Sequence, residues 1–180
     1  MSTASPQERP TDRTAEWQAL DAAARSKVSG YGVASRDAVA AMSGVEMLRA
    51  LLDGRLPAPP IMQTLDMALV EVEVGRVAFQ GRPSFAHYNP MGTVHGGWFA
   101  TLLDSAVGCV VQSVLGAGKG YTTAELKINI VRPLTDQVPV VRAEATIVYL
   151  GRRMATAEGR LTGPDGKLYA HASTTCFLFE

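Results

Sequence analysis

Cysteine is scarce in this chain of 180 residues, which carries only Cys109 and Cys176. Two widely separated thiols do not make a disulfide framework, so we expect both to be reduced packing residues. An excess of one charge sign is also missing, because Lys plus Arg and Asp plus Glu number 17 each. A chain without net charge gives no electrostatic reason to expect a nucleic acid or an anionic membrane as a partner.

Several enzyme motifs are absent as well. The chain has no Gly-x-Ser-x-Gly elbow, as serine hydrolases have, and no Gly-x-Gly-x-x-Gly of a dinucleotide-binding fold. The glycine-rich stretch Gly116–Gly120 contains Lys119 but lacks the spacing of a phosphate-binding loop, so we interpret it as a helix stop. The three histidines have no metal-ligand spacing and no cysteine or carboxylate cluster beside them. We therefore expect no metal.

Long apolar runs are the third absence. The N-terminal residues Met1–Asp12 are polar, unlike a signal peptide. The most apolar segment, Trp98–Leu115, is interrupted by polar side chains at Thr101, Asp104, Ser105 and Gln112. We expect no membrane span, and a cytoplasmic location follows by default.

Helical patterns occupy the first third of the chain. After about a dozen residues with the composition of disordered segments, Thr14–Val28 has helical composition. A capping-box pattern at Ser43 predicts a second helix that Gly54 ends. A proline-rich connector follows. We interpret residues 1–58 as an N-terminal extension, partly disordered and helical, and residues 59–180 as the main domain.

The main domain has two strand patterns, one long helix over Gly96–Leu115, and then four more strand patterns. The alternation of apolar and polar residues and the turn signals predict strands over Met67–Val74, Arg76–Arg82, Tyr121–Arg132, Pro139–Leu150, Met154–Thr162 and Leu168–Phe179. No helices alternate with the later strands, so we expect an antiparallel sheet and an α+β fold.

The long predicted helix carries one aspartate, Asp104, in otherwise apolar surroundings. Its apolar residues cover most of the circumference, which indicates a helix buried on most sides. Small residues share one line with Asp104, so a ligand or another chain could approach the backbone there: Gly97, Ala100, Thr101 and Gly108. No basic residue stands three or four positions away. Burial would then raise the pKa of Asp104 and favour a general base or nucleophile; the alternative is a structural carboxylate bonded elsewhere in the fold.

The start of this helix has a different chemistry. His95 is followed by Gly96 and Gly97, which leave the free N–H groups and positive partial charge of a helix N-terminus accessible. Such groups suit a carbonyl oxygen that becomes negative in a transition state. Asp104 lies roughly 10–12 Å further along the helix. That is too far for one chain to hold both the carbonyl and its nucleophile, and a site shared with a second subunit would resolve the mismatch.

Taken together, these residues resemble the PaaI-type (phenylacetate-degradation) hotdog thioesterases. The resemblance covers about residues 59–180 and rests on the following segments: Asn89, His95-Gly96-Gly97, Asp104, Tyr121-Thr122-Thr123-Ala124-Glu125-Leu126-Lys127 and Arg132-Pro133. It implies an antiparallel sheet wrapped around one long helix, in units that pair as homodimers or homotetramers. It further implies acyl-CoA hydrolysis to free acid and CoA, with no separate cofactor because CoA is part of the substrate. The N-terminal extension is longer than in the shortest members, and we assign it no catalytic role.

The resemblance also assigns roles to single residues. Asp104 would be the nucleophile or the base for a water, and the Gly96 N–H would polarise the thioester carbonyl across the subunit interface. Asn89 would orient water or the carbonyl, His95 would help to fix the site, and Thr122 would lie close to the catalytic carboxylate. Substrate contacts would come from Gly97, Thr123, Gly151, Arg152 and Arg153, the last three at the CoA phosphates.

Two other functions remain open at this point. A hotdog domain can bind acyl-CoA as a sensor without cleaving it, although Asp104 and Asn89 argue against that. A hotdog hydratase acting on enoyl-CoA is less favoured, since those enzymes carry a motif with Asp and His five residues apart, which this chain lacks.

Overall fold

The computed structural model of the chain describes residues 12–180, so the disorder expected for the first dozen residues lies almost wholly outside it. Four helices come first: α1 (Thr14–Ser26), α2 (Arg36–Ala40), α3 (Gly44–Leu52) and α4 (Pro60–Thr64). The remaining elements are β1 (Met67–Glu73), β2 (Arg76–Gly81), a short 3-10 helix (Phe85–His87), α5 (Gly96–Ser113), β3 (Gly120–Ile130), β4 (Val141–Leu150), β5 (Met154–Thr162) and β6 (Leu168–Phe179). The two shortest α-helices, α2 and α4, were not predicted, because five residues are too few for a helical period to show.

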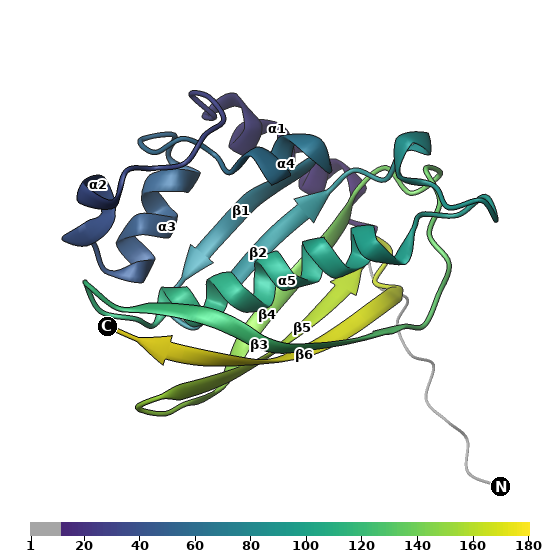
Figure 1. Cartoon of the computed structure of the whole chain (residues 1–180). Coiled ribbons are helices and arrows are strands. Elements are labelled where there is room, and N and C mark those ends of the chain that lie inside the picture. The colour runs from purple at the N-terminus through teal and green to yellow at the C-terminus, as the bar shows by residue number, and fades with distance from the viewer. Residues whose placement is uncertain (1–11) are drawn as a thin grey trace, which may run out of the picture.

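The six strands form one antiparallel sheet in the order β1-β2-β4-β5-β6-β3. The sheet curves around α5, and the N-terminal helices lie at the β1 side (Figure 1). This arrangement confirms the predicted α+β hotdog fold. None of the helices in residues 12–180 has the combination of length and apolar character that is needed to cross a membrane.

Small residues let α5 lie close against the inner face of the sheet. Alanines from three strands are buried there: Ala143, Ala145, Ala155, Ala157, Ala170 and Ala172. A Cβ added at Gly159 would lie 2.8 Å from Val107 of the helix, well inside van der Waals contact. The helix supplies the large side chains of this core, among them Leu102, Leu103 and Val110, all fully buried.

The edge strand β1 is covered on both faces, unlike a strand with one face in water. Met67 and Leu69 belong to the main core, while Ala68 and Val70 pack with Ala24 of α1 in a second apolar cluster. The helix α1 is also held by charge. Its Asp21 is fully buried and forms ion pairs with Arg25 and with Arg82, which follows β2.

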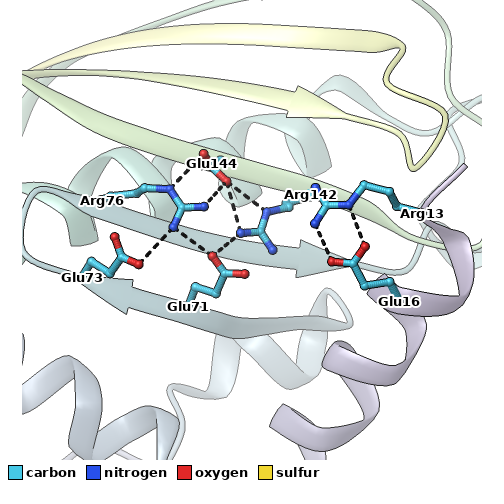
Figure 2. Close-up of polar contacts among 7 residues, drawn as sticks. All are labelled: Arg13, Glu16, Glu71, Glu73, Arg76, Arg142 and Glu144. Carbon is cyan, nitrogen blue, oxygen red and sulfur yellow. Dashed lines mark hydrogen bonds and ion pairs between the residues drawn. The ribbon is translucent and has the colours of Figure 1, made fainter. Parts of the chain in front are cut away.

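A network of ion pairs joins strands β1, β2 and β4 beside α1 (Figure 2). Arg76 pairs with Glu71, Glu73 and Glu144, and Arg142 pairs with Glu71 and Glu144. Burial alone would raise the pKa of Glu71, but the bonds and charges of Arg142 and Arg76 bring it below its usual value. The guanidinium groups of Arg13 and Arg142 also lie 5.5 and 5.9 Å from the ring centre of Trp17 on α1. The network therefore continues onto the N-terminal helix.

Candidate active site

The first turn of α5 leaves one backbone N–H without a partner. His95 caps the helix, and its Nδ1 accepts the N–H of Gly97 at 2.9 Å. The N–H of His95 donates to the carbonyl of His87 at 2.8 Å, and the N–H of Trp98 donates to the carbonyl of His95 at 3.0 Å. Within residues 12–180, the N–H of Gly96 has no acceptor. It is the only one of these four N–H groups that is free for a ligand.

Asn89 shapes the loop that leads into this turn. Its carboxamide oxygen accepts the N–H groups of Met91 at 2.9 Å and Thr93 at 3.3 Å, and its nitrogen donates to the Thr93 hydroxyl at 3.0 Å. Asn89 and Gly96 line one cavity of about 370 Å³. The side chain of Asn89 therefore positions the loop around the free N–H, while one hydrogen of its amide stays available.

Asp104 lies further along α5 and is half-buried. Its Oδ1 is buried and has no hydrogen-bond partner among the described residues. Burial raises the pKa of this carboxyl group, and a side-chain hydrogen bond from Thr123 of β3 opposes the rise. The sequence predicted a raised pKa from the missing basic neighbours, and the structure agrees in direction and cause.

The stripe of small residues beside Asp104 is filled partly by the chain itself. A Cβ added at Gly108 would lie 2.5 Å from the hydroxyl oxygen of Tyr121, so the tyrosine ring of β3 packs directly on the helix backbone. The prediction that a ligand or another chain approaches at this line is therefore wrong at Gly108. The hydroxyl of Thr101, closer to the helix start, donates to the carbonyl of Gly97 at 3.0 Å.

Within one chain the two halves of the candidate site do not meet. Asp104 lines a cavity with Ser105 and Tyr121, and this cavity is distinct from the one that contains Gly96. Eight residues of helix separate Gly96 from Asp104, or roughly 12 Å at the α-helical rise. Thr122 and Thr123 are both exposed on β3, and it is the hydroxyl of Thr123, not that of Thr122, that opposes the rise in the pKa of Asp104.

A third group of predicted residues gathers near the other end of α5. Gly151, Arg152 and Arg153, in the turn between β4 and β5, line a cavity of about 410 Å³ together with Lys119. Both arginines and the lysine are exposed. The sequence interpretation of Gly116–Gly120 as a helix stop passed over Lys119, because nothing local in the sequence places it beside the β4–β5 turn.

The comparisons with known proteins agree with this fold. A family model described as the thioesterase superfamily matches residues 91–170. A phenylacetic acid degradation-related protein of Ralstonia eutropha is 29% identical in sequence, with a TM-score of 0.65 over 75% of this chain and 98% of its own. A mutant of the phenylacetic acid degradation protein PaaI from Thermus thermophilus is 28% identical, with a TM-score of 0.59 over 66% and 97%. The chain is a thioesterase with a hotdog fold, and it resembles the PaaI proteins.

A further solved structure supports the enzyme class. A thioesterase family protein from Silicibacter pomeroyi is 26% identical to this PaaI-like thioesterase, with a TM-score of 0.61 over 67% of this chain and 89% of its own. The comparison with curated proteins finds no match. The predicted enzyme class, a thioesterase, is thereby confirmed.

Proposed function

We propose that this thioesterase hydrolyses acyl-CoA to free acid and CoA at a site shared by two subunits. The observation that carries the proposal is the pairing of a buried, unpartnered carboxylate oxygen with an unused helix N–H on the same helix. A carboxyl group with a raised pKa beside a cavity is typical of a catalytic base or nucleophile. Because Asp104 and Gly96 of one chain lie roughly 12 Å apart along the helix, we assign them to two different sites.

The chemistry follows from these two groups. As a general base, Asp104 takes a proton from water while the hydroxyl oxygen forms a bond to the thioester carbonyl carbon. The N–H of Gly96 of the partner subunit donates to the oxygen that becomes negative. The C–S bond then breaks, the CoA sulfur takes the proton, and the acid is released. As a nucleophile, Asp104 would instead form an anhydride that water hydrolyses in a second step.

Other residues of the proposed site position these groups. The Thr123 hydroxyl of β3 opposes the rise in the pKa of Asp104 and so favours its ionised form. His95 keeps the Gly97 N–H occupied, so that the Gly96 N–H is the donor left for the carbonyl. Asn89 has one amide hydrogen left to orient water or the carbonyl, beside Gly96 in the same cavity.

The CoA phosphates have a place at the cluster of Lys119, Arg152 and Arg153. Three exposed cations around one cavity suit a group with several negative charges. The cluster lies past the end of α5, which ends at Ser113, roughly 14 Å beyond Asp104 along the helix axis. The long pantetheine arm of CoA lies between the phosphates and the thioester, and the cations are therefore well separated from the reacting atoms.

Self-association would use the free edge of the sheet. Strand β3 pairs only with β6 within the described residues, so its other side is open to a second copy. The exposed Ile130 and Val131 lie at the end of this strand. Pairing there would bring the Asp104 and Gly96 groups of two copies together in a homodimer, the unit from which a homotetramer can be built.

Subunit complementation tests the shared site directly. Asp104→Asn removes the carboxylate, and Gly96→Pro removes the free N–H at a position, the first of the helix, where proline is tolerated. Each variant alone is expected to be inactive in a thiol-release assay on acyl-CoA. After mixed refolding, random pairing leaves one intact site in each heterodimer and restores about a quarter of native activity.

Two results would contradict the proposal. No recovery in the mixture, with heterodimers present, would mean that each chain builds its own site. If the native protein binds acyl-CoA but releases no thiol, it is an acyl-CoA sensor and does not hydrolyse this substrate.

A further inference from the structure

A cavity of about 250 Å³ begins at Asp104 and runs under the N-terminal helices. Its far wall is built from Val28 after α1, Leu48 and Leu51 of α3, and Met62 of α4. The strands β1 and β2 form another side of the cavity, with Leu69 among its lining residues. Most of the wall therefore comes from residues 14–64, a segment to which the proposed hydrolysis assigns no role.

The polar side chains that line this cavity come from α5 and β3 and not from the N-terminal helices. Asp104, Ser105 and Tyr121 line it beside α5, and no Lys, Arg or His is among its lining residues. The Ser105 hydroxyl is already used, since it donates to the carbonyl of Thr101 at 2.8 Å. The cavity therefore suits an uncharged, apolar group whose polar attachment point lies at Asp104. The acyl part of a thioester has this distribution of polarity.

The size of the cavity limits the group that fits. A protein cavity of roughly 150 Å³ lined by apolar side chains holds benzene. The cavity of about 250 Å³ beside Asp104 therefore has room for an acyl group larger than one ring, in the range of medium-length chains. A long fatty acyl chain would need a larger space, and an acetyl group would leave most of it empty.

The N-terminal wall is fixed to the domain by specific contacts. Helix α3 begins against the end of α5, where the Gly44 N–H donates to the carbonyl of Leu115 at 2.9 Å. A Cβ added at Gly44 would lie 1.7 Å from the carbonyl oxygen of Gln112, so the two backbones are in direct contact. Helix α1 is held by the ion pair between Asp21 and Arg82 and by the contact of Arg142, a member of the network in Figure 2, with the ring of Trp17. The wall is thus a fixed part of the cavity.

We propose that the N-terminal helices are the acyl-selecting element of this enzyme, with Leu51 and Met62 setting the length of a medium-sized apolar acyl group. The inference rests on the proposed function, because the acyl group enters this cavity only if its thioester is held at Asp104. It assigns a task to the N-terminal extension, which the sequence interpretation left without a catalytic role.

Leu51→Trp tests the proposal, because a larger side chain at this partly buried position fills the cavity. We expect the ratio of kcat/KM for octanoyl-CoA to that for acetyl-CoA to fall at least tenfold, the order that misfitting methylene groups cost in an apolar pocket. Arg49→Trp is the matched control, since Arg49 is exposed on the same helix outside the cavity. It is expected to leave the ratio unchanged. Equal losses on both substrates in Leu51→Trp would overturn the proposal.

A second variant and a binding measurement guard against a misfolded protein. Met62→Ala enlarges the cavity and is expected to move the preference towards dodecanoyl-CoA. Calorimetry in the Asp104→Asn background measures binding without turnover: octanoyl-CoA is expected to bind at least tenfold more tightly than acetyl-CoA, and Leu51→Trp to remove the difference. If the native enzyme cleaves no acyl-CoA, the proposed function fails, but the difference in binding still tests whether the cavity selects the acyl group. Equal binding of both thioesters would refute acyl selection by the cavity and leave the proposed hydrolysis untouched.

Discussion

Replacing Asp104 by asparagine should abolish hydrolysis and stabilise the fold in the same variant. The carboxyl group is half-buried, its Oδ1 has no partner in residues 12–180, and burial raises its pKa. A carboxylate in that position destabilises the folded state, since ionisation is easier in the unfolded chain. A structural carboxylate held by hydrogen bonds would have the opposite effect on stability.

The pH dependence has a definite sign. The unfolded carboxyl group titrates near 3.8 and the folded one at a higher pH. Below both values the aspartate is neutral in both states, and it costs nothing. As the pH rises through this window, the folded state loses stability relative to the unfolded state, and above the folded pKa the loss is complete. The gain from Asp104→Asn is therefore present above the folded pKa and disappears in acid.

The expected size of the gain is modest. The asparagine amide is still polar, so the gain comes only from removing the charge, and water screens a half-exposed charge to about 1 kcal/mol. In a domain of this length, such a change raises the melting temperature by roughly 2–4 °C. Loss of a general base lowers kcat by at least ~10²-fold.

Two assays on the same preparations decide the matter. Thermal melting followed by circular dichroism at pH 7 and at pH 3.5, at equal subunit concentration, measures the stability difference. Thiol release measures kcat. Glu158→Gln, which removes an exposed carboxylate, serves as a control that should change neither. An Asp104→Asn protein that melts below the native enzyme at pH 7, or that keeps most of its activity, would refute the reasoning.

Two further outcomes are expected. Gly108→Ala places a Cβ 2.5 Å from the Tyr121 hydroxyl oxygen, and it should lower the free energy of unfolding, measured with denaturant, by about 1–3 kcal/mol. Adding Tyr121→Phe to the same chain removes the hydroxyl and should recover much of this loss. If the effects of the two substitutions on the free energy of unfolding simply add, the contact is contradicted. Alanine at all three of Lys119, Arg152 and Arg153 should raise KM for acyl-CoA about tenfold or more, through the loss of charge-assisted contacts. It should not change KM for the matching N-acetylcysteamine thioester, which has no phosphates, and a rise for both substrates would argue against phosphate binding.

The sequence was most informative where one pattern had one structural meaning. Met154–Thr162 and Leu168–Phe179 were predicted with the bounds that the structure has, because alternation and the intervening turn signal both apply there. The start of α5 was predicted at Gly96 for a similar reason, and its end differs by two residues. At β1 the alternating pattern did not predict that both faces of the strand are buried. Nothing in Met67–Glu73 indicates that α1 covers the outer face.

The site was less accessible than the fold because its parts come together over long separations in sequence. Asp104 and the free N–H of Gly96 could be inferred from one helix. Thr123 could not be inferred in this way. Neighbouring strand residues face opposite sides, so which of Thr122 and Thr123 faces Asp104 depends on how β3 lies against α5. Lys119 meets Arg152 only through the sheet order. Local patterns carry no information on such encounters.

The order of the strands has a consequence for synthesis. Strand β3 follows α5 directly in the chain, yet its partner is β6, the last strand, and β2 pairs with β4 across the whole helix. Such non-local pairing slows folding. During synthesis β3 therefore has no hydrogen-bond partner, and α5 is not fully covered, until Leu168–Phe179 have been made. Loss of the C-terminal strand would leave the helix that carries Asp104 exposed, and the chain would be prone to aggregate before it could act.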